Sequence, residues 1–238
     1  MSRAEAFRAM HRAPPLLVLP NAWDVASARA FAALPGCRAI ATSSAAVARS
    51  LGWDDGELTP VDEMLRVVER IAAAVDIPVT ADLEAGYGDP QRTAARALAA
   101  GAAGMNLEDS RGAELLGVDD QVAIIRAVHA AAPSLVLNAR VDVFLKGSRD
   151  VDEAVERGNA YLAAGADCVY PIAAPFETVG ALASRVDGPV NVLASPHRPP
   201  LGQLERLGVA RVTFGSGLAS VALDEAARVA ANALDGER

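Results

Sequence analysis

The stretch AAGAAGMNLE (residues 99–108) decides the fold, because it joins a helix end, a glycine turn and a short buried strand. The same order of features recurs in AAGADCVYPI (residues 163–172) and in RLGVARVTFG (residues 206–215). Glycine suits the left-handed backbone conformation at which helices commonly end. Each phrase therefore predicts a helix that stops at its glycine and a strand that follows; the glycines are Gly101, Gly165 and Gly208.

Outward from these phrases, β-branched runs alternate with Ala-rich amphipathic stretches, as they do in consecutive βα units with a parallel sheet. The predicted strands are residues 16–19, 39–42, 79–82, 104–108, 135–140, 168–172, 190–194 and 211–214. The predicted helices are residues 24–34, 60–75, 90–100, 119–131, 152–164, 177–186, 201–207 and 219–234. Thr59 and Asp89, each followed by a proline, are expected to cap the helices that begin there. Eight units in 238 residues predict one (β/α)8 TIM barrel, a single domain over residues 1–238.

Composition and charge narrow the class of function. The chain is 52% hydrophobic, has a formal net charge of −8 and contains no cluster of basic and aromatic residues, so nucleic acid and anionic membranes are not expected partners. No apolar run approaches the length of a membrane span, and the first residues do not resemble a secretion signal. Cys37 and Cys168 have no metal-ligand spacing. We expect a soluble cytoplasmic protein with reduced cysteines that acts on a small molecule.

Acidic residues gather at the predicted carboxyl ends of neighbouring strands, where barrel enzymes place their active sites. Asp82 and Glu84 are two residues apart and are expected on one side of their strand, with Glu108 on the next strand. Three carboxylates this close need a proton, an arginine or a cation, and oxygen ligands suit Mg²⁺, or Mn²⁺ in its place. The alternative for each acid is a helix cap or a pair with a surface arginine.

Other polar residues at the same end have two interpretations each. Ser43 and Ser44, followed by Ala45 and Ala46, form either a carboxylate-binding segment or only a loop, and Arg140 binds either a substrate carboxylate or the nearby Glu108 or Asp142. The glycines beside Tyr87 allow either a tight turn at a ligand or an ordinary turn. His197 is interpreted as a loop residue. Lys146 is the sole lysine and lies beyond the fifth strand, which argues against an imine-forming aldolase.

Together these segments resemble a known family, the isocitrate lyase and phosphoenolpyruvate (PEP) mutase superfamily, in its shorter mutase-like branch. The resemblance covers nearly the whole chain. It rests on LPNAWDVASARAF (residues 19–31), ATSSAAVARSLGWDDGE (41–57), TADLEAGYGD (80–89), GMNLEDS (104–110) and NARVDVF (138–144), in this order.

The resemblance implies a role for each site residue. Asp82 would be the most direct magnesium ligand, and Glu84 and Glu108 would bind the ion mainly through water. Asp55 would lie near substrate and metal, the segment from Ser43 to Ala46 would receive a carboxylate or phosphonate, and Arg140 would hold the other end of the substrate. It also implies homo-oligomers, dimers or tetramers. Whether the last helix is exchanged between partners stays open, because the chain ends soon after Leu234.

The chain departs from the family pattern where the reaction is decided. The lyases carry a Lys-Lys-Cys-Gly-His loop after the fourth strand and the mutases a gating loop with lysine and asparagine, but EDSRGAELLGVDD (residues 108–120) contains no lysine, cysteine, histidine or asparagine. Arg111 is the basic residue of this segment. Asp54 replaces a proline common in the family, and Glu84 stands where many members have aspartate.

The parts that remain suit the stabilisation of an enolate. We therefore expect a Mg²⁺-dependent lyase that cleaves the carbon–carbon bond beside the carbonyl of a small 2-oxo or 2-hydroxy acid, for example by decarboxylating oxaloacetate. A larger substrate needs a proton donor, for which Tyr87, Asp55 and His197 are the candidates. The alternatives are mutase or hydrolase chemistry on a phosphorus–carbon bond and a non-catalytic protein that binds a 2-oxo acid.

Overall fold

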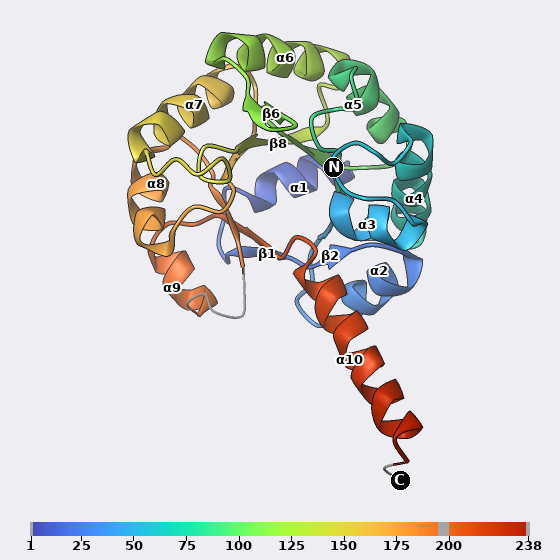
Figure 1. Cartoon of the computed structure of the whole chain (residues 1–238). Coiled ribbons are helices and arrows are strands. Elements are labelled where there is room, and N and C mark those ends of the chain that lie inside the picture. Colours follow the sequence, from blue (N-terminus) through green and yellow to red (C-terminus); the bar gives the residue numbers. More distant parts are fainter. Residues whose placement is uncertain (1, 195–199, 237–238) are drawn as a thin grey trace.

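The computed structural model describes residues 2–194 and 200–236, and Figure 1 shows strands surrounded by a ring of helices. All predicted strands and helices are present, with small shifts at their ends. The strands of the ring are β1 (Leu17–Leu19), β2 (Asn21–Ala22), β3 (Ile40–Thr42), β4 (Val79–Asp82), β5 (Gly104–Leu107), β8 (Val136–Val141), β9 (Cys168–Pro171), β10 (Asn191–Leu193) and β11 (Arg211–Thr213). The helices that follow them are α2 (Val25–Ala32), α4 (Val61–Ala73), α5 (Pro90–Ala99), α6 (Val118–Ala131), α7 (Val151–Ala163), α8 (Val179–Arg185), α9 (Leu201–Arg206) and α10 (Gly217–Leu234).

The strands pair in parallel in two sheets. One has six strands in the order β2-β3-β4-β5-β8-β9, and the other has three in the order β1-β11-β10. Pro20 separates β1 from β2 along the chain, and an isolated parallel bridge joins Val169 in β9 to Val190, immediately before β10. The protein is thus an α/β protein with parallel sheets, as its alternating sequence predicts.

Local chemistry fixes most helix ends as expected. Gly101, Gly165 and Gly208 all have positive φ angles, from 86° to 115°, directly after α5, α7 and α9. Asp89 caps α5 by accepting a hydrogen bond from the backbone of Arg92, with Pro90 in the first turn. The predicted cap at Thr59 is wrong: α4 begins after Pro60 without a side-chain cap, and the buried Thr59 hydroxyl has no partner among the described residues.

Besides the two-residue strand β2, three further features of the described residues are additional to the predicted elements. Helix α1 (Arg3–Met10) precedes the first strand, α3 (Ser44–Leu51) follows β3, and a small antiparallel hairpin of β6 (Ser110–Arg111) and β7 (Glu114–Leu115) follows β5. In Figure 1, α1 lies across the inside of the ring of helices. Within the described residues, no helix has the length and apolar character needed to cross a membrane.

Alternation along the strands separates an apolar outer face from a polar inner one. Ala81, Met105 and Val169 belong to the main apolar core that also includes side chains of α4 to α8. Helix α1 packs its Phe7 in a second cluster with β1 residues, and a side chain at Gly104 would collide with the Phe7 ring. The inner positions between these packed layers are therefore free to carry polar side chains toward the carboxyl ends of the strands.

Candidate active site

A cavity of about 190 Å³ lies at the carboxyl ends of the strands. Residues from β2, β3, β4, β5, β8, β9, β10 and β11, or from the loops after them, form its walls. They are Asn21, Ser43, Ser44, Ala45, Asp55, Asp82, Asn106, Arg140, Tyr170, Ile172, Leu193, Thr213, Gly215 and Ser216. Of the residues predicted for substrate binding, all but Ala46 line this cavity.

The segment from Ser43 to Ala46 is the amino end of α3, and not only a loop. Ser43 caps the helix by accepting a hydrogen bond from Ala46 N at 3.4 Å. Ser44 donates from both its backbone N and its Oγ to Asp82 Oδ2, each at 3.1 Å. The amino end of a helix carries partial positive charge, so this wall of the cavity suits an anionic group.

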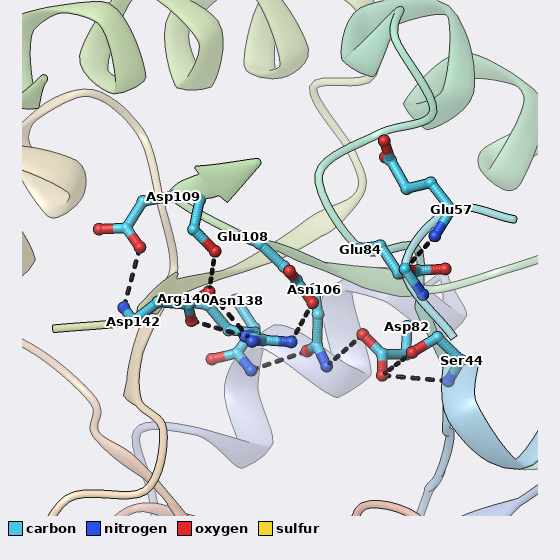
Figure 2. Close-up of polar contacts among 12 residues, drawn as sticks. Ser44, Glu57, Asp82, Glu84, Asn106, Glu108, Asp109, Asn138, Arg140 and Asp142 are labelled. Atoms are coloured by element: carbon cyan, nitrogen blue, oxygen red, sulfur yellow. Dashed lines mark hydrogen bonds and ion pairs between the residues drawn. The ribbon is translucent and has the colours of Figure 1, made fainter. Parts of the chain in front are cut away.

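A row of buried amides continues from Asp82 across the strands, as Figure 2 shows. Asn106 donates from Nδ2 to Asp82 Oδ1 at 3.3 Å and accepts at Oδ1 from Asn138 Nδ2 at 2.8 Å. The same oxygen accepts from the fully buried Arg211 at 3.3 Å. Sequence reasoning missed these residues, although polar residues on the inner face of otherwise apolar strands were a usable signal.

Arg140 is held by two acids. Its guanidinium donates to Glu108 and, through Nε at 2.9 Å and Nη2 at 3.1 Å, to the fully buried Asp142. Asp142 in turn accepts a hydrogen bond from the hydroxyl of Ser110. Both interpretations of Arg140 therefore have support, because it pairs with Glu108 and Asp142 and also lines the cavity. Three of its five N–H groups bond to described residues, so two remain for a ligand.

Glu84 lies in a turn and not on the strand. Strand β4 ends at Asp82, and Glu84 has a φ of 50°, so the alternation that was expected to align Asp82 with Glu84 does not extend this far. The Glu84 carboxylate accepts from Gly56 N at 2.9 Å, Glu57 N at 2.6 Å and the Tyr87 hydroxyl at 2.7 Å. Glu57 and Tyr87 also have positive φ angles, 61° and 55°. Such backbone strain in non-glycine residues gathers at functional sites.

The three acids predicted to bind metal thus have separate protein partners: Ser44 and Asn106 for Asp82, backbone amides and Tyr87 for Glu84, and Arg140 for Glu108. Within the described part of the chain, no group of three histidine, cysteine or acidic side chains is arranged to hold a metal ion. The negative charges of these acids nevertheless repel one another. Burial, with the charges of Asp82 and Glu84 adding to it, raises the pKa of Glu108 to about 9 despite the attraction of Arg140.

Burial likewise raises the pKa of Glu84 to about 7, with added repulsion from Asp55 and Asp82. The pKa of Asp55 is raised as well, by burial and by Asp82, although a hydrogen bond with the Ser44 side chain opposes the shift. Arg140 is the one basic residue among the described residues that line the cavity of about 190 Å³. Carboxylates that are buried and under-neutralised are a donor set that a hard divalent cation fits.

The remaining predicted residues occupy different places. Asp55 lines the cavity near Asp82, whereas the Tyr87 hydroxyl is bonded to Glu84 and Tyr87 is not among the lining residues. His197 lies outside the described residues. Arg111 lines a second, smaller cavity of about 130 Å³ beside Glu84 and Glu108. Lys146 lines this cavity too, and it donates to the carbonyl of Gly112 in the β6–β7 hairpin at 2.6 Å. The sole lysine of the chain therefore contacts the segment of residues 108–120, which has no lysine of its own.

Known proteins are similar to this chain in sequence and in fold. An uncharacterised protein of Mycobacterium tuberculosis is 35% identical over 98% of this chain and 90% of its own length. The 2-methylisocitrate lyase of Bacillus subtilis is 32% identical over 73% of this chain, and the match spans 61% of that enzyme. The structure of phosphoenolpyruvate phosphomutase from Streptomyces platensis subsp. rosaceus superposes with a TM-score of 0.90 at 28% identity, over 99% of this chain and 88% of that one.

The family described as phosphoenolpyruvate phosphomutase matches residues 7–234, nearly the full chain. The relatives that share its sequence or fold include lyases as well as mutases. This protein therefore belongs to the phosphoenolpyruvate phosphomutase family and, with it, to the isocitrate lyase/PEP mutase superfamily of enzymes.

Proposed function

We propose that this enzyme is a cation-dependent lyase that breaks the carbon–carbon bond beside the carbonyl of a small 2-oxo or 2-hydroxy acid and passes through an enolate. Decarboxylation of oxaloacetate and retro-aldol release of a pyruvate-like product are the two forms of this reaction. The relationship to a 2-methylisocitrate lyase supports cleavage of a carbon–carbon bond. We also propose a cytoplasmic location, which the two free thiols support.

One observation carries the proposal: the amino end of α3, Asp82 and Arg140 all face one cavity of about 190 Å³. A space of this size fits an acid of a few carbons and is smaller than the sites of drug-sized ligands. Its two positively polarised walls, one at Ser44 and one at Arg140, suit a substrate that carries anionic oxygen at both ends.

The architecture that brings these walls together is, we propose, a single closed (β/α)8 barrel and one domain over residues 1–238. Strands β1 and β2 adjoin at Pro20, and the bridge between Val169 and Val190 links the other two edges of the sheets. The ladders between neighbouring strands of the two larger sheets are all parallel. Closure explains why residues from strands so far apart in sequence line one cavity.

The site is, we propose, completed by Mg²⁺, or by Mn²⁺. Asp82, Glu84 and Glu108 would hold the ion, with Asp82 as the most direct ligand, because the surplus negative charge around them calls for a cation. When bound, a divalent cation neutralises these acids and stabilises negative charge that develops on substrate oxygen.

The chain's own residues supply binding and orientation. Arg140 would hold a substrate carboxylate with the two N–H groups left after its bonds to Glu108 and Asp142. The amino end of α3 would receive the anionic oxygen at the other end, with Ser43, Ser44 and Ala45 against it. Asn106, fixed by Asn138 and Arg211, keeps Asp82 oriented toward the cavity.

Phosphorus–carbon chemistry is the second candidate. The matching family is described as phosphoenolpyruvate phosphomutase, and a mutase of that name shares the fold. A mutase or hydrolase of this kind would use the same cavity, with a phosphonate or phosphate in place of one carboxylate.

A substrate panel tests the proposal. We expect the enzyme to convert oxaloacetate or a related 2-oxo or 2-hydroxy acid to a pyruvate-like product when MgCl₂ or MnCl₂ is present and to lose this activity in EDTA, as followed by proton NMR. Turnover of phosphonopyruvate or phosphoenolpyruvate instead, followed by phosphorus NMR, would establish the second candidate. Tight binding of oxalate by calorimetry without turnover of any panel member would identify a non-catalytic binding protein.

We also propose that the enzyme is a homo-oligomer, a dimer or a tetramer, assembled through α10. This helix projects away from the ring in Figure 1, and every residue from Val221 to Gly236 is exposed. Leu223 and Val229 are 56% and 54% exposed, and Leu234 is 87% exposed. Its charged residues Asp224, Glu225 and Arg228 lie on one side of the helix, so an apolar side stays uncovered. A second copy of this chain is the partner that we propose for this side.

Substitution of this apolar side should dissociate the assembly. We expect the double variant Leu223→Glu/Val229→Glu to shift the mass measured by light scattering from an oligomer to a monomer, because two charges cannot be buried without partners. Asp224→Asn, on the polar side, should keep the wild-type mass. A wild-type protein that is already monomeric at tens of micromolar (~10⁻⁵ M, far above the Kd of a stable assembly) would contradict the proposal.

A further inference from the structure

Tyr170 is a buried phenol in the wall of the active-site cavity, in a position that no sequence motif indicated. It lies on β9, only 4% exposed, and its register partner across the β8–β9 ladder is Arg140. Val169 packs in the outer core, so alternation turns Tyr170 to the inner face. Ile172, two residues further along, lines the same cavity.

Within the described part of the chain, the hydroxyl of Tyr170 has a partner that orients it. Its oxygen is hydrogen-bonded to the side chain of Thr213 on β11, which also lines the cavity. Asn191 Nδ2 donates to Thr213 Oγ1 at 3.3 Å, and the Thr213 hydroxyl also lies 3.4 Å from Asn191 Oδ1, so Asn191 and Tyr170 Oη share the one threonine proton. Among the described residues no acceptor takes the phenol proton of Tyr170, so this proton can be directed into the cavity.

The surroundings favour a phenol that gives up its proton only when a strong base faces it. Burial raises the pKa of Tyr170 to about 12, so the group is protonated at neutral pH, and the bond from Thr213 and the charges of Arg140 and Arg211 moderate this shift. The same two guanidinium groups would stabilise the phenolate after the proton has left. The carbon of an enolate is a base strong enough to take it.

Three other candidate positions for a proton donor are less suited to this step. Tyr87 donates its hydroxyl proton to Glu84 and lies outside the cavity lining. The segment from Glu108 to Asp120, where the lyases of this superfamily place their cysteine, has no cysteine, histidine or lysine. Cys168, the buried cysteine on the same strand as Tyr170, is not a lining residue.

We propose that Tyr170 is the catalytic acid that protonates the enolate carbon in the reaction proposed above, on which this inference rests. Cleavage of the carbon–carbon bond leaves its electron pair in the enolate. The Oη–H bond of Tyr170 then breaks, a C3–H bond forms, and the enolate electrons return to the carbonyl of the pyruvate-like product. Water that enters as the product leaves returns a proton to the phenolate.

The reverse of this step provides the test, because it exchanges the methyl protons of pyruvate with solvent. Wild-type enzyme with MgCl₂ should exchange pyruvate methyl protons in D₂O, followed by proton NMR. Tyr170→Phe should lose about a hundredfold or more of this exchange rate, yet retain oxalate binding by calorimetry, because the cavity itself is unchanged.

Tyr161→Phe is the matched control. Tyr161 is also buried and hydrogen-bonded, to Asp109 and Arg157, but it lies outside the cavity lining. Its variant should exchange pyruvate protons at the wild-type rate. An equal loss in Tyr161→Phe and Tyr170→Phe would overturn the inference, because the loss would then reflect packing.

Further outcomes separate this inference from the proposed function. Wild-type enzyme that cleaves oxaloacetate but exchanges no pyruvate protons, or a Tyr170→Phe variant with full exchange, overturns the role of Tyr170 and leaves the function standing. Wild-type enzyme that cleaves no 2-oxo acid overturns both. If Tyr170→Phe does not fold, Thr213→Val replaces it: the phenol remains without its partner, and exchange should fall about tenfold, the worth of one hydrogen bond. Unchanged exchange in Thr213→Val would then refute the proposal.

Discussion

Asp82→Asn is expected to remove cation-dependent turnover, a loss of about a thousandfold or more, because several kcal/mol of charge stabilisation at the reacting oxygen depends on the cation. The substitution keeps the size of the side chain and its place beside Ser44 and Asn106, so the fold should persist. Steady-state rates with and without MgCl₂ measure the first effect. Calorimetric titration with MgCl₂ alone measures cation binding independently of activity, and it should show a weakened site.

Asp76→Asn is the control for this variant. Asp76 is an exposed aspartate that lies 3.8 Å from Arg3, far from the cavity lining, and its substitution should change neither turnover nor cation binding. Wild-type rates in Asp82→Asn, or unaltered MgCl₂ binding, would show that the cation site has been assigned to the wrong residue.

Arg140→Met is expected to reduce both stability and activity. The substitution leaves Glu108 and Asp142 buried without their guanidinium partner, and removal of one member of a buried ion pair costs about 3–5 kcal/mol. It also removes the proposed clamp for a substrate carboxylate. Urea unfolding followed by circular dichroism should show the drop in the free energy of unfolding, and kcat/KM should fall in any protein that stays folded.

Arg185→Met tests whether burial is the reason. Arg185 pairs with Asp152 at 2.7 Å, but the side chains are 47% and 82% exposed, and an exposed pair contributes at most about 1 kcal/mol. A similar loss in the free energy of unfolding in both variants would mean that burial does not make the ion pairs of Arg140 contribute more to stability than an exposed pair. Substitution of Asp142 by asparagine in the Arg140→Met background should recover part of the lost stability, since one uncompensated charge is removed.

The secondary structure was predictable because each signal for it is local. The glycines after α5, α7 and α9 end their helices, and Asp89 with Pro90 begins α5, as their own side chains and backbone preferences require. Thr59 shows the limit of such signals. A threonine before a proline has the chemistry of a cap, yet Pro60 itself takes the cap position and the Thr59 side chain is buried in the tertiary structure.

The site was predictable in membership more than in arrangement. Asp82, Ser44 and Arg140 were expected at strand ends, and all three line one cavity. The position of Glu84 was not predictable, because its left-handed backbone follows from the contacts of its carboxylate with the loop at Gly56 and Glu57, which are distant in sequence. The choice between partners for Arg140 likewise depended on how close β5 brings Glu108.

By itself, the sequence determined the alternation of strands and helices, the polar inner face at the strand ends and the family, since these depend on residue type and spacing. Only the tertiary structure decided that the backbone amide of Ser44 at the start of α3 points toward Asp82 and that Arg140 pairs with two acids. It also decided that Tyr170, and not Tyr87, lines the cavity and that α10 projects away from the ring. Each of these depends on which segments, far apart along the chain, pack next to one another, and a hydrogen bond or a desolvated charge exists only once that packing has excluded water.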